Sequence, residues 1–126
     1  MKTILLNIFL LTALSISAQT EVDFLNAIGN DKMEKLNAHL ADNVILCIND
    51  NQEKVDKALA IQKIKDFLKR KKIVRFKILH NGKSADKSSS YRVARLKTPG
   101  GTYRIFAYSE RTGNTSKVVE VRIDAM

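Results

Sequence analysis

The sequence predicts an α+β domain in which N-terminal helices and one long helix pack against a curved antiparallel sheet. Apolar residues recur at helical spacing in the first half of the chain, and the period changes from 3.6 to 2 after Lys72. A Pro-Gly-Gly turn at residues 99–101 then separates two alternating segments. Helices first and strands second are typical of a sheet that helices cover on one face.

The first 18 residues are predicted to be a secretory signal peptide. Lys2 precedes an apolar run over residues 4–14, and small residues lead up to Ala18. A positive start, an apolar segment too short to span a bilayer and small residues before the cleavage point are what export requires. A retained anchor or a buried helix is the alternative. We therefore expect residues 19–126 to form a single exported soluble domain, periplasmic or secreted, without a transmembrane segment.

The 126-residue chain is basic. Its formal net charge is +9, which becomes +8 when Lys2 leaves with the signal peptide, and such an excess suits anionic partners. Cys47 is the only cysteine, so packing rather than a disulfide holds the core, and its apolar neighbours predict that it is buried. His39 and His80 have no clustered Cys or Glu, so we expect no metal site. No cofactor motif is found.

The first two predicted helices form a short hairpin. Residues 21–30 form the first, with an apolar stripe of Val22, Phe24, Leu25 and Ile28. Gly29-Asn30 is expected to end it. Asp31 is expected to cap the second, whose apolar positions are Met33, Leu36 and Leu40.

A buried strand and the longest predicted helix come next. Residues 44–48 are a continuous apolar run of strand length, which fits a strand covered on both faces. Asp56 is expected to cap the third helix, whose apolar stripe is Ala60, Ile61, Ile64, Phe67 and Leu68. The basic run at residues 69–72 suits the negative end of that helix's dipole.

Four further strands are predicted to form a meander: residues 74–78, 90–98, 102–109 and 117–123. His80-Asn81-Gly82 is expected to close the first of them. In the turn, Pro99 presets one corner and Gly100 is expected to have positive φ. The loops at residues 83–89 and 110–116 are predicted to be mobile. On the last strand, Val119, Val121 and Ile123 are expected to face one way, and Val118, Glu120 and Arg122 the other.

Three segments carry a family resemblance: Ala41-Asp42-Asn43-Val44, Gly101-Thr102-Tyr103-Arg104-Ile105-Phe106 and Glu120-Val121-Arg122-Ile123. With the order of elements, they resemble a family of small exported proteins that is typical of Bacteroidetes-type bacteria and has no assigned function. The resemblance covers nearly all of residues 20–124. It implies the nuclear transport factor 2-like, or cystatin-like, cone, whose open end often holds a pocket. Superfamily members use that pocket as an active site, a ligand site or a dimer contact, so the fold does not select a function. The resemblance also implies a Gram-negative periplasm and supplies no catalytic residue.

Five residues are candidates for a ligand-binding site: His80, Tyr103, Arg104, Glu120 and Arg122. The last four would surround the mouth of a pocket. The alternative for the last strand is a row of cross-strand ion pairs on the solvent-exposed face, with Glu120 opposite an Arg of the neighbouring strand.

These features predict a binding or interaction module with a basic surface rather than an enzyme. The expected partner is an anionic small molecule, an envelope component or an acidic protein, and a homodimer is left open. Nucleic acid is not expected, because no aromatic residues interleave the basic run. The alternative is a small pocket enzyme of the isomerase or dehydratase type, in which His80 or Tyr103 takes part in general acid/base proton transfer. An ionisable residue inside the cone would favour the enzyme.

Overall fold

A computed structural model describes residues 16–83 and 88–126, without the side chains of residues 16–18, 80, 81 and 83. Residues 1–15 of the predicted signal peptide and residues 84–87 of the predicted loop lie outside the described residues. The elements are α2 (Ile16–Gly29), the 3₁₀ helix η1 (Met33–Ala38), β1 (Leu40–Ile48), β2 (Asn51–Asp56), α3 (Lys57–Leu68), β3 (Arg75–Lys83), β4 (Ser89–Thr98), β5 (Gly101–Thr112) and β6 (Thr115–Ala125). No helix in this part of the chain is long and apolar enough to cross a membrane.

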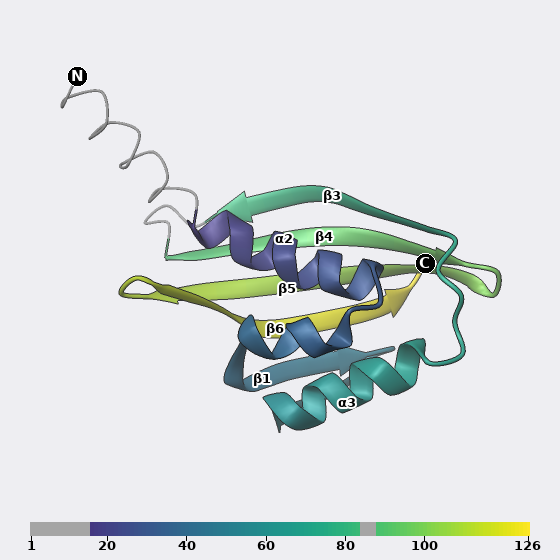
Figure 1. Ribbon diagram of the computed structural model, residues 1–126, viewed down its shortest axis with the longest axis horizontal. Coiled ribbons are helices and arrows are strands. Elements are labelled where there is room, and N and C mark those ends of the chain that lie inside the picture. The colour runs from purple at the N-terminus through teal and green to yellow at the C-terminus, as the bar shows by residue number, and fades with distance from the viewer. Residues whose placement is uncertain (1–15, 84–87) are drawn as a thin grey trace, which may run out of the picture.

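The strands form one six-stranded sheet in the order β2-β1-β6-β5-β4-β3. Neighbouring strands are antiparallel except β1 and β6, which are parallel. The helices lie on one face of the curved sheet (Figure 1), with α2 over β4, β5 and β6 and α3 beside β1 and β2. The predicted α+β fold is confirmed, although its sheet is mixed and has one strand more than expected.

Large apolar side chains fill the space between the helices and the sheet. Those that are fully buried include Phe24, Leu25, Ile28, Leu36, Leu46, Ile64, Leu96, Ile105 and Ile123. They come from both helices and from the strands of both halves of the sheet. These residues form one core cluster beneath the helices.

Helix α3 follows the prediction closely. The Asp56 carboxylate accepts a hydrogen bond from the backbone N–H of Leu59 at 2.8 Å, which caps the helix. Ala60, Ile64 and Leu68 are buried on one face. Its 12 residues make it shorter than α2, which has 14, so α3 is not the longest helix.

The second predicted helix and the segment after β1 were predicted wrongly. Residues 33–38 form a 3₁₀ helix, and Leu40 already belongs to β1. Asp31 has φ of 56° and does not cap that helix. Asn49 and Asp50 have φ of 49° and 69°, the left-handed pair that a tight hairpin turn requires. The chain therefore returns at once as β2, a polar edge strand that is not among the predicted strands.

Several strand ends also differ from the prediction. β3 runs through His80-Asn81-Gly82 to Lys83, with a shift in register between Ile78 and Asn81. β5 and β6 extend through most of the predicted loop 110–116, leaving a turn at Gly113-Asn114. In the β4–β5 turn the positive φ, 151°, belongs to Gly101 and not to Gly100.

A bulge in β6 breaks the predicted alternation at Val118 and Val119, whereas Val121 and Ile123 face the core and Glu120 and Arg122 the other face, as predicted. Ser109 of β5 pairs with Val118, while the preceding Tyr108 pairs with Glu120, so Val119 has no partner. The extra residue brings Val118 into the core together with Val121 and Ile123, all fully buried. Val119 is only partly buried.

Candidate functional site

Five exposed cations gather on the outer face of the sheet, the face away from the helices. They are Arg75 and Lys77 on β3, Arg95 and Lys97 on β4, and Arg104 on β5. Their neighbours along the strands, such as Leu96 and Ile105, belong to the core. Because side chains alternate across a sheet, the cations point outward. We call these five residues the basic strip.

The register places like charges of the basic strip directly opposite each other. Arg75 pairs with Lys97, Lys77 with Arg95, and Arg95 with Arg104. Like charges in this position destabilise a sheet. Within the described part of the chain no ion pair involves the strip; the ion pairs found there use Lys57, Lys63 and Arg122. Asp124 on β6 lies opposite Arg104 at the edge of the strip, but no ion pair joins them, so the like-charged pairs are left without a bound counter-charge among the described residues.

A depression of about 530 Å³ lies along the strip. It is lined by Arg75, Lys77, Arg95, Lys97, Thr102 and Met126. None of these described lining residues is acidic, so the depression has a positive potential.

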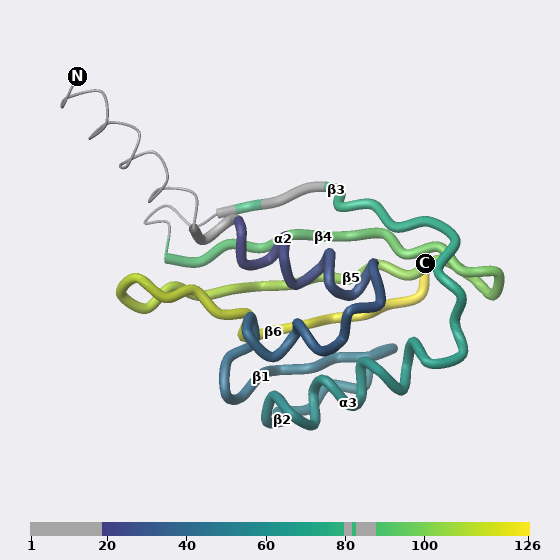
Figure 2. The backbone as a smooth tube through the Cα atoms, in the orientation of Figure 1, coloured from purple at the N-terminus to yellow at the C-terminus, as the bar shows by residue number. Residues whose placement is uncertain are grey.

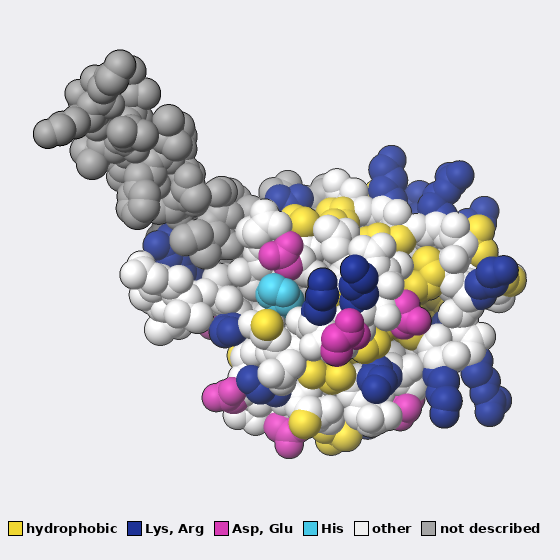
Figure 3. All heavy atoms as spheres, in the orientation of Figure 1, with side chains coloured by type: hydrophobic (Ala, Val, Ile, Leu, Met, Phe, Trp, Pro, Cys, Tyr) yellow, Lys and Arg dark blue, Asp and Glu magenta, His cyan; other side chains and the backbone are white. Residues whose placement is uncertain are grey.

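The basic strip continues into a wider basic end of the molecule. The C-terminus lies there, beside the β4–β5 turn and the segment that joins α3 to β3 (Figure 2). That segment contributes the exposed side chains of Lys69, Arg70 and Lys72. Seen from the helix side, dark blue side chains gather at this end (Figure 3).

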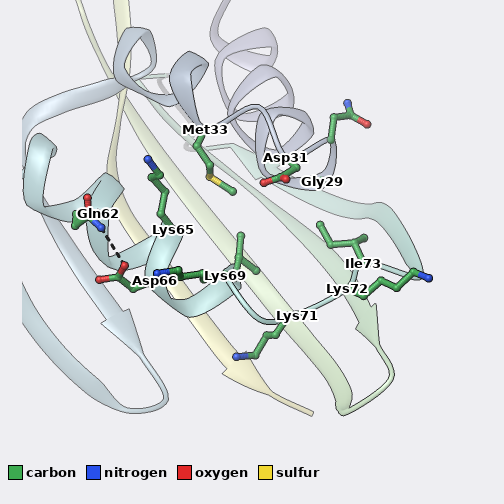
Figure 4. A pocket seen from close by; sticks show the side chains of 12 residues that line it. Gly29, Asp31, Met33, Gln62, Lys65, Asp66, Lys69, Lys71, Lys72 and Ile73 are labelled. Atoms are coloured by element: carbon green, nitrogen blue, oxygen red, sulfur yellow. Dashed lines mark hydrogen bonds between the residues drawn. The ribbon is translucent and has the colours of Figure 1, made fainter.

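A separate groove of about 740 Å³ lies between the end of α2, η1 and the second half of α3. Asp31 and Asp66 share its lining with four lysines, Lys65, Lys69, Lys71 and Lys72. The lysine amino groups point in different directions (Figure 4). Lys71 Nζ donates to the Phe67 carbonyl at 2.8 Å and lies 4.0 Å from the centre of the Phe67 ring. The groove therefore contains side chains of both charges. Lys71 caps the C-terminal end of α3, as expected for a cation at the negative end of a helix dipole.

A carboxylate, Glu21, lies inside the cone. Its side chain is 1% exposed, and Oε1 accepts a hydrogen bond from Ser90 Oγ at 2.6 Å. The hydroxyls of Ser90 and Ser109 are 3.2 Å apart. Among the described residues, Glu21 Oε2 and the buried Arg92 Nε have no hydrogen-bond partner. The helical spacing of Glu21 with Phe24, Leu25 and Ile28 could have revealed this buried position, but the sequence reasoning missed it.

The five predicted site residues do not come together in one place. Tyr103 faces the core, where its ring meets Phe67 edge-on with centroids 5.1 Å apart. Arg104 belongs to the basic strip on the opposite face. Glu120 and Arg122 are neighbours on the outer face of β6, with 3.7 Å between Oε2 and Nη1. The His80 side chain lies outside the described part of the chain.

The prediction that Glu120 lies opposite an Arg is wrong. Its partners are Tyr108 on β5 and Ile45 on β1, because the β6 bulge resets the register. The ion pair it does form, with Arg122, runs along its own strand.

Arg122 also helps to cover Cys47 on the outer face of the sheet. Cys47 pairs with Arg122 on one side and with Gln52 on the other. A long hydrogen bond of 3.5 Å joins Arg122 Nη1 to Gln52 Oε1. This contact crosses the Cys47 position on the outer face. Cys47 is 2% exposed, which confirms its predicted burial.

Comparison with known proteins identifies the family of this chain. No curated protein matches it, but the model of DUF4783, a domain of unknown function, matches residues 22–124. A DUF4783 protein from Bacteroides fragilis is 28% identical, with a TM-score of 0.75 over 83% of this chain and 97% of that one. One from Bacteroides ovatus is 24% identical, with a TM-score of 0.75 over 82% and 93%.

A more distant structure supports the fold alone. An NTF2-like protein from Cytophaga hutchinsonii is 17% identical, with a TM-score of 0.63 over 89% of this chain and 97% of that one. The resemblance drawn from the three sequence segments is thereby confirmed. The chain belongs to the DUF4783 family and has the nuclear transport factor 2-like, cystatin-like fold.

Proposed function

We propose that this protein is an exported binding module whose basic strip holds an anionic component of the cell envelope. The observation that carries the proposal is the set of three like-charged pairs in the register of β3, β4 and β5. Each such pair works against the fold by roughly 0.2–1 kcal/mol. Residues that oppose stability and are not needed by the core are typical of a binding surface.

An anion bound along the strip would attract each of the cations and so offset the repulsion between them. All five side chains are exposed, and four of them, Arg75, Lys77, Arg95 and Lys97, line the depression. Binding would therefore rest on several solvent-screened contacts, and it should weaken as salt is added. The predicted signal peptide supports a location where anionic envelope polymers and lipid headgroups are present.

Substitution of Arg95 tests the proposal, because this residue lies opposite both Lys77 and Arg104. Arg95→Gln should raise the free energy of unfolding by about 0.5–1 kcal/mol and weaken binding to dextran sulfate, a soluble polyanion. Lys54→Gln, which removes an exposed charge opposite Ile45 on β1, is the matched control and should change neither. Unchanged dextran sulfate binding by the Arg95 variant would refute the proposal.

A second candidate function is proton-transfer catalysis, which the buried position of Glu21 favours. A carboxylate inside a cone can act as a general base if a substrate reaches it. Deuterium incorporation at the α-carbon of cyclic ketones in heavy water would report such a reaction. We expect none, because Glu21 is 1% exposed and hydrogen-bonded to Ser90. Exchange that the Glu21→Gln variant lost would instead assign the enzyme.

A further inference from the structure

We infer that the basic strip docks the protein on the surface of an anionic lipid bilayer. The inference rests on the proposed function and names the class of its partner. It depends on what surrounds the cations, on the shape of the surface and on the aromatic residues at that end of the molecule.

Exposed apolar side chains accompany the cations. Large hydrophobic residues that are well exposed in the described part of the chain are Leu59, Val74 and Met126. Val74 is 60% exposed, and its backbone N–H donates to the Lys97 carbonyl at 2.8 Å. Met126 is 63% exposed, and its N–H donates to the Thr102 carbonyl at 2.8 Å. The backbones of both residues are thus held beside the strip, and Met126 also lines its depression. A cationic surface with exposed apolar residues at its edge suits the headgroup region of a bilayer.

The shape of the surface argues against a small anionic ligand. Small ligands bind in concave sites that bury most of their surface and converge polar groups on it. Here five exposed cations are spread over three strands, and the depression that four of them line has no buried residue in its lining. Lys69, Arg70 and Lys72 extend the charge further on the adjoining segment. A lipid surface presents many phosphates at once and needs no fixed register with the cations.

The aromatic residues argue against an acidic protein. Protein interfaces are usually anchored by a few aromatic or arginine side chains in well-packed pockets. Phe76 and Tyr103, which alternate with the strip, pack against the core. Phe106, on the same face as Arg104, stacks on Tyr91 with ring centroids 5.4 Å apart, and no aromatic residue is among the well exposed large apolar residues of the described chain. The arginines of the strip are themselves exposed and not seated in a pocket.

Vesicle co-sedimentation tests the inference. The protein is taken in the form recovered from cells, with its N-terminus determined by mass spectrometry. Vesicles contain phosphatidylglycerol and phosphatidylcholine in equal parts, or phosphatidylcholine alone. We expect binding to the anionic vesicles only, and binding that weakens with salt.

Two double variants remove the same charge from different places. Arg95→Gln with Arg104→Gln should lower the vesicle partition coefficient about thirtyfold, since each basic residue near an anionic surface contributes about one factor of five. Lys35→Gln with Lys54→Gln removes two exposed cations outside the basic end and should leave the coefficient within about twofold. Equal losses in the two double variants would overturn the inference.

A third variant distinguishes binding to a lipid bilayer from binding to other polyanions. Met126→Ser should weaken vesicle binding severalfold while leaving dextran sulfate binding unchanged, because only a bilayer takes up the apolar tip. Dextran sulfate binding without any preference for anionic vesicles would overturn the membrane inference and leave the proposed function standing. Binding to poly-glutamate but not to vesicles would overturn it in favour of an acidic protein. Loss of binding to every anionic probe would overturn both proposals.

Discussion

Glu21 inside the cone and the basic strip on the outer face place their ionisable side chains in opposite environments. The Glu21 carboxyl group is removed from water; its Oε1 accepts a short hydrogen bond from Ser90, and its Oε2 has no partner among the described residues. The cations of the strip are in water and lie opposite one another, and Asp124 lies opposite Arg104 at the edge of the strip. A buried polar group depends on its hydrogen bonds, whereas an exposed repulsive cluster is tolerated because water screens it. The folded state therefore depends on the Glu21–Ser90 bond but does not need the strip, which makes the strip the better indication of a function.

Removing the Ser90 hydroxyl tests the structural half of this contrast and has the largest expected effect. Ser90→Ala leaves Glu21 Oε1 buried without its 2.6 Å donor. Loss of one partner of a buried polar group costs about 1–3 kcal/mol in the free energy of unfolding, which urea denaturation measures.

Ser109→Ala is the matched control for that experiment. It removes a hydroxyl 3.2 Å from Ser90 but leaves the bond to Glu21 in place, so the loss should be clearly smaller. Equal effects of the two substitutions would mean that the carboxylate does not depend on Ser90.

The turn that aligns the basic strip gives the next largest effect. Gly101 has φ of 151°, and a Cβ placed there would meet nothing within 4 Å. Gly101→Val should therefore destabilise the domain through backbone strain alone, by about 1–2 kcal/mol in thermal or urea unfolding. Gly100 has no positive φ, so Gly100→Ala should leave stability unchanged or slightly higher. A larger loss from Gly100→Ala than from Gly101→Val would contradict the turn geometry.

Periodicity was sufficient to predict the parts of the fold that alternate cleanly. The cap at Asp56, the stripe of α3 and the hairpin at residues 99–101 all follow from local rules. β2 could not be found this way, because an edge strand needs few apolar residues and Val55 is the one buried residue of this strand. The β6 bulge also has no local signal, and it places Val118 in the core instead of Val119, while the alternation from Glu120 onward is as predicted.

The candidate site was predictable in composition but not in arrangement. Arg104 was identified as a ligand-binding candidate, and its outward direction follows from alternation along its strand. Its position opposite Arg95 depends on the register between strands, which the sequence of one strand does not contain. The burial of Glu21 was accessible from helical spacing, whereas its partner Ser90, and Ser109 next to Ser90, lie about 70 and 90 positions away along the chain.

A smaller effect is expected where Arg122 covers Cys47. Removal of the Arg122 side chain takes away its 3.5 Å contact with Gln52 on the other side of the cysteine. Arg122→Ala should therefore speed labelling of the native thiol by a maleimide about tenfold, because access governs thiol reactivity at a buried site. Lys54→Gln, on the same edge strand as Gln52, is the control and should label as slowly as the unmodified protein. Rapid labelling of the unmodified protein would show that Cys47 is not covered.

The smallest effect is expected at Glu120. Its carboxylate contacts Arg122 at 3.7 Å on a surface where both side chains are about a third exposed. Glu120→Ala should lower the free energy of unfolding by less than about 1 kcal/mol, the usual ceiling for an exposed ion pair. Arg122 would keep its contact with Gln52. Because Glu120 lies outside the basic strip, dextran sulfate binding should stay the same or increase slightly as a negative charge is lost. A marked loss of binding would instead place Glu120 within the anion site and would weaken the assignment of that site to the cations of β3, β4 and β5.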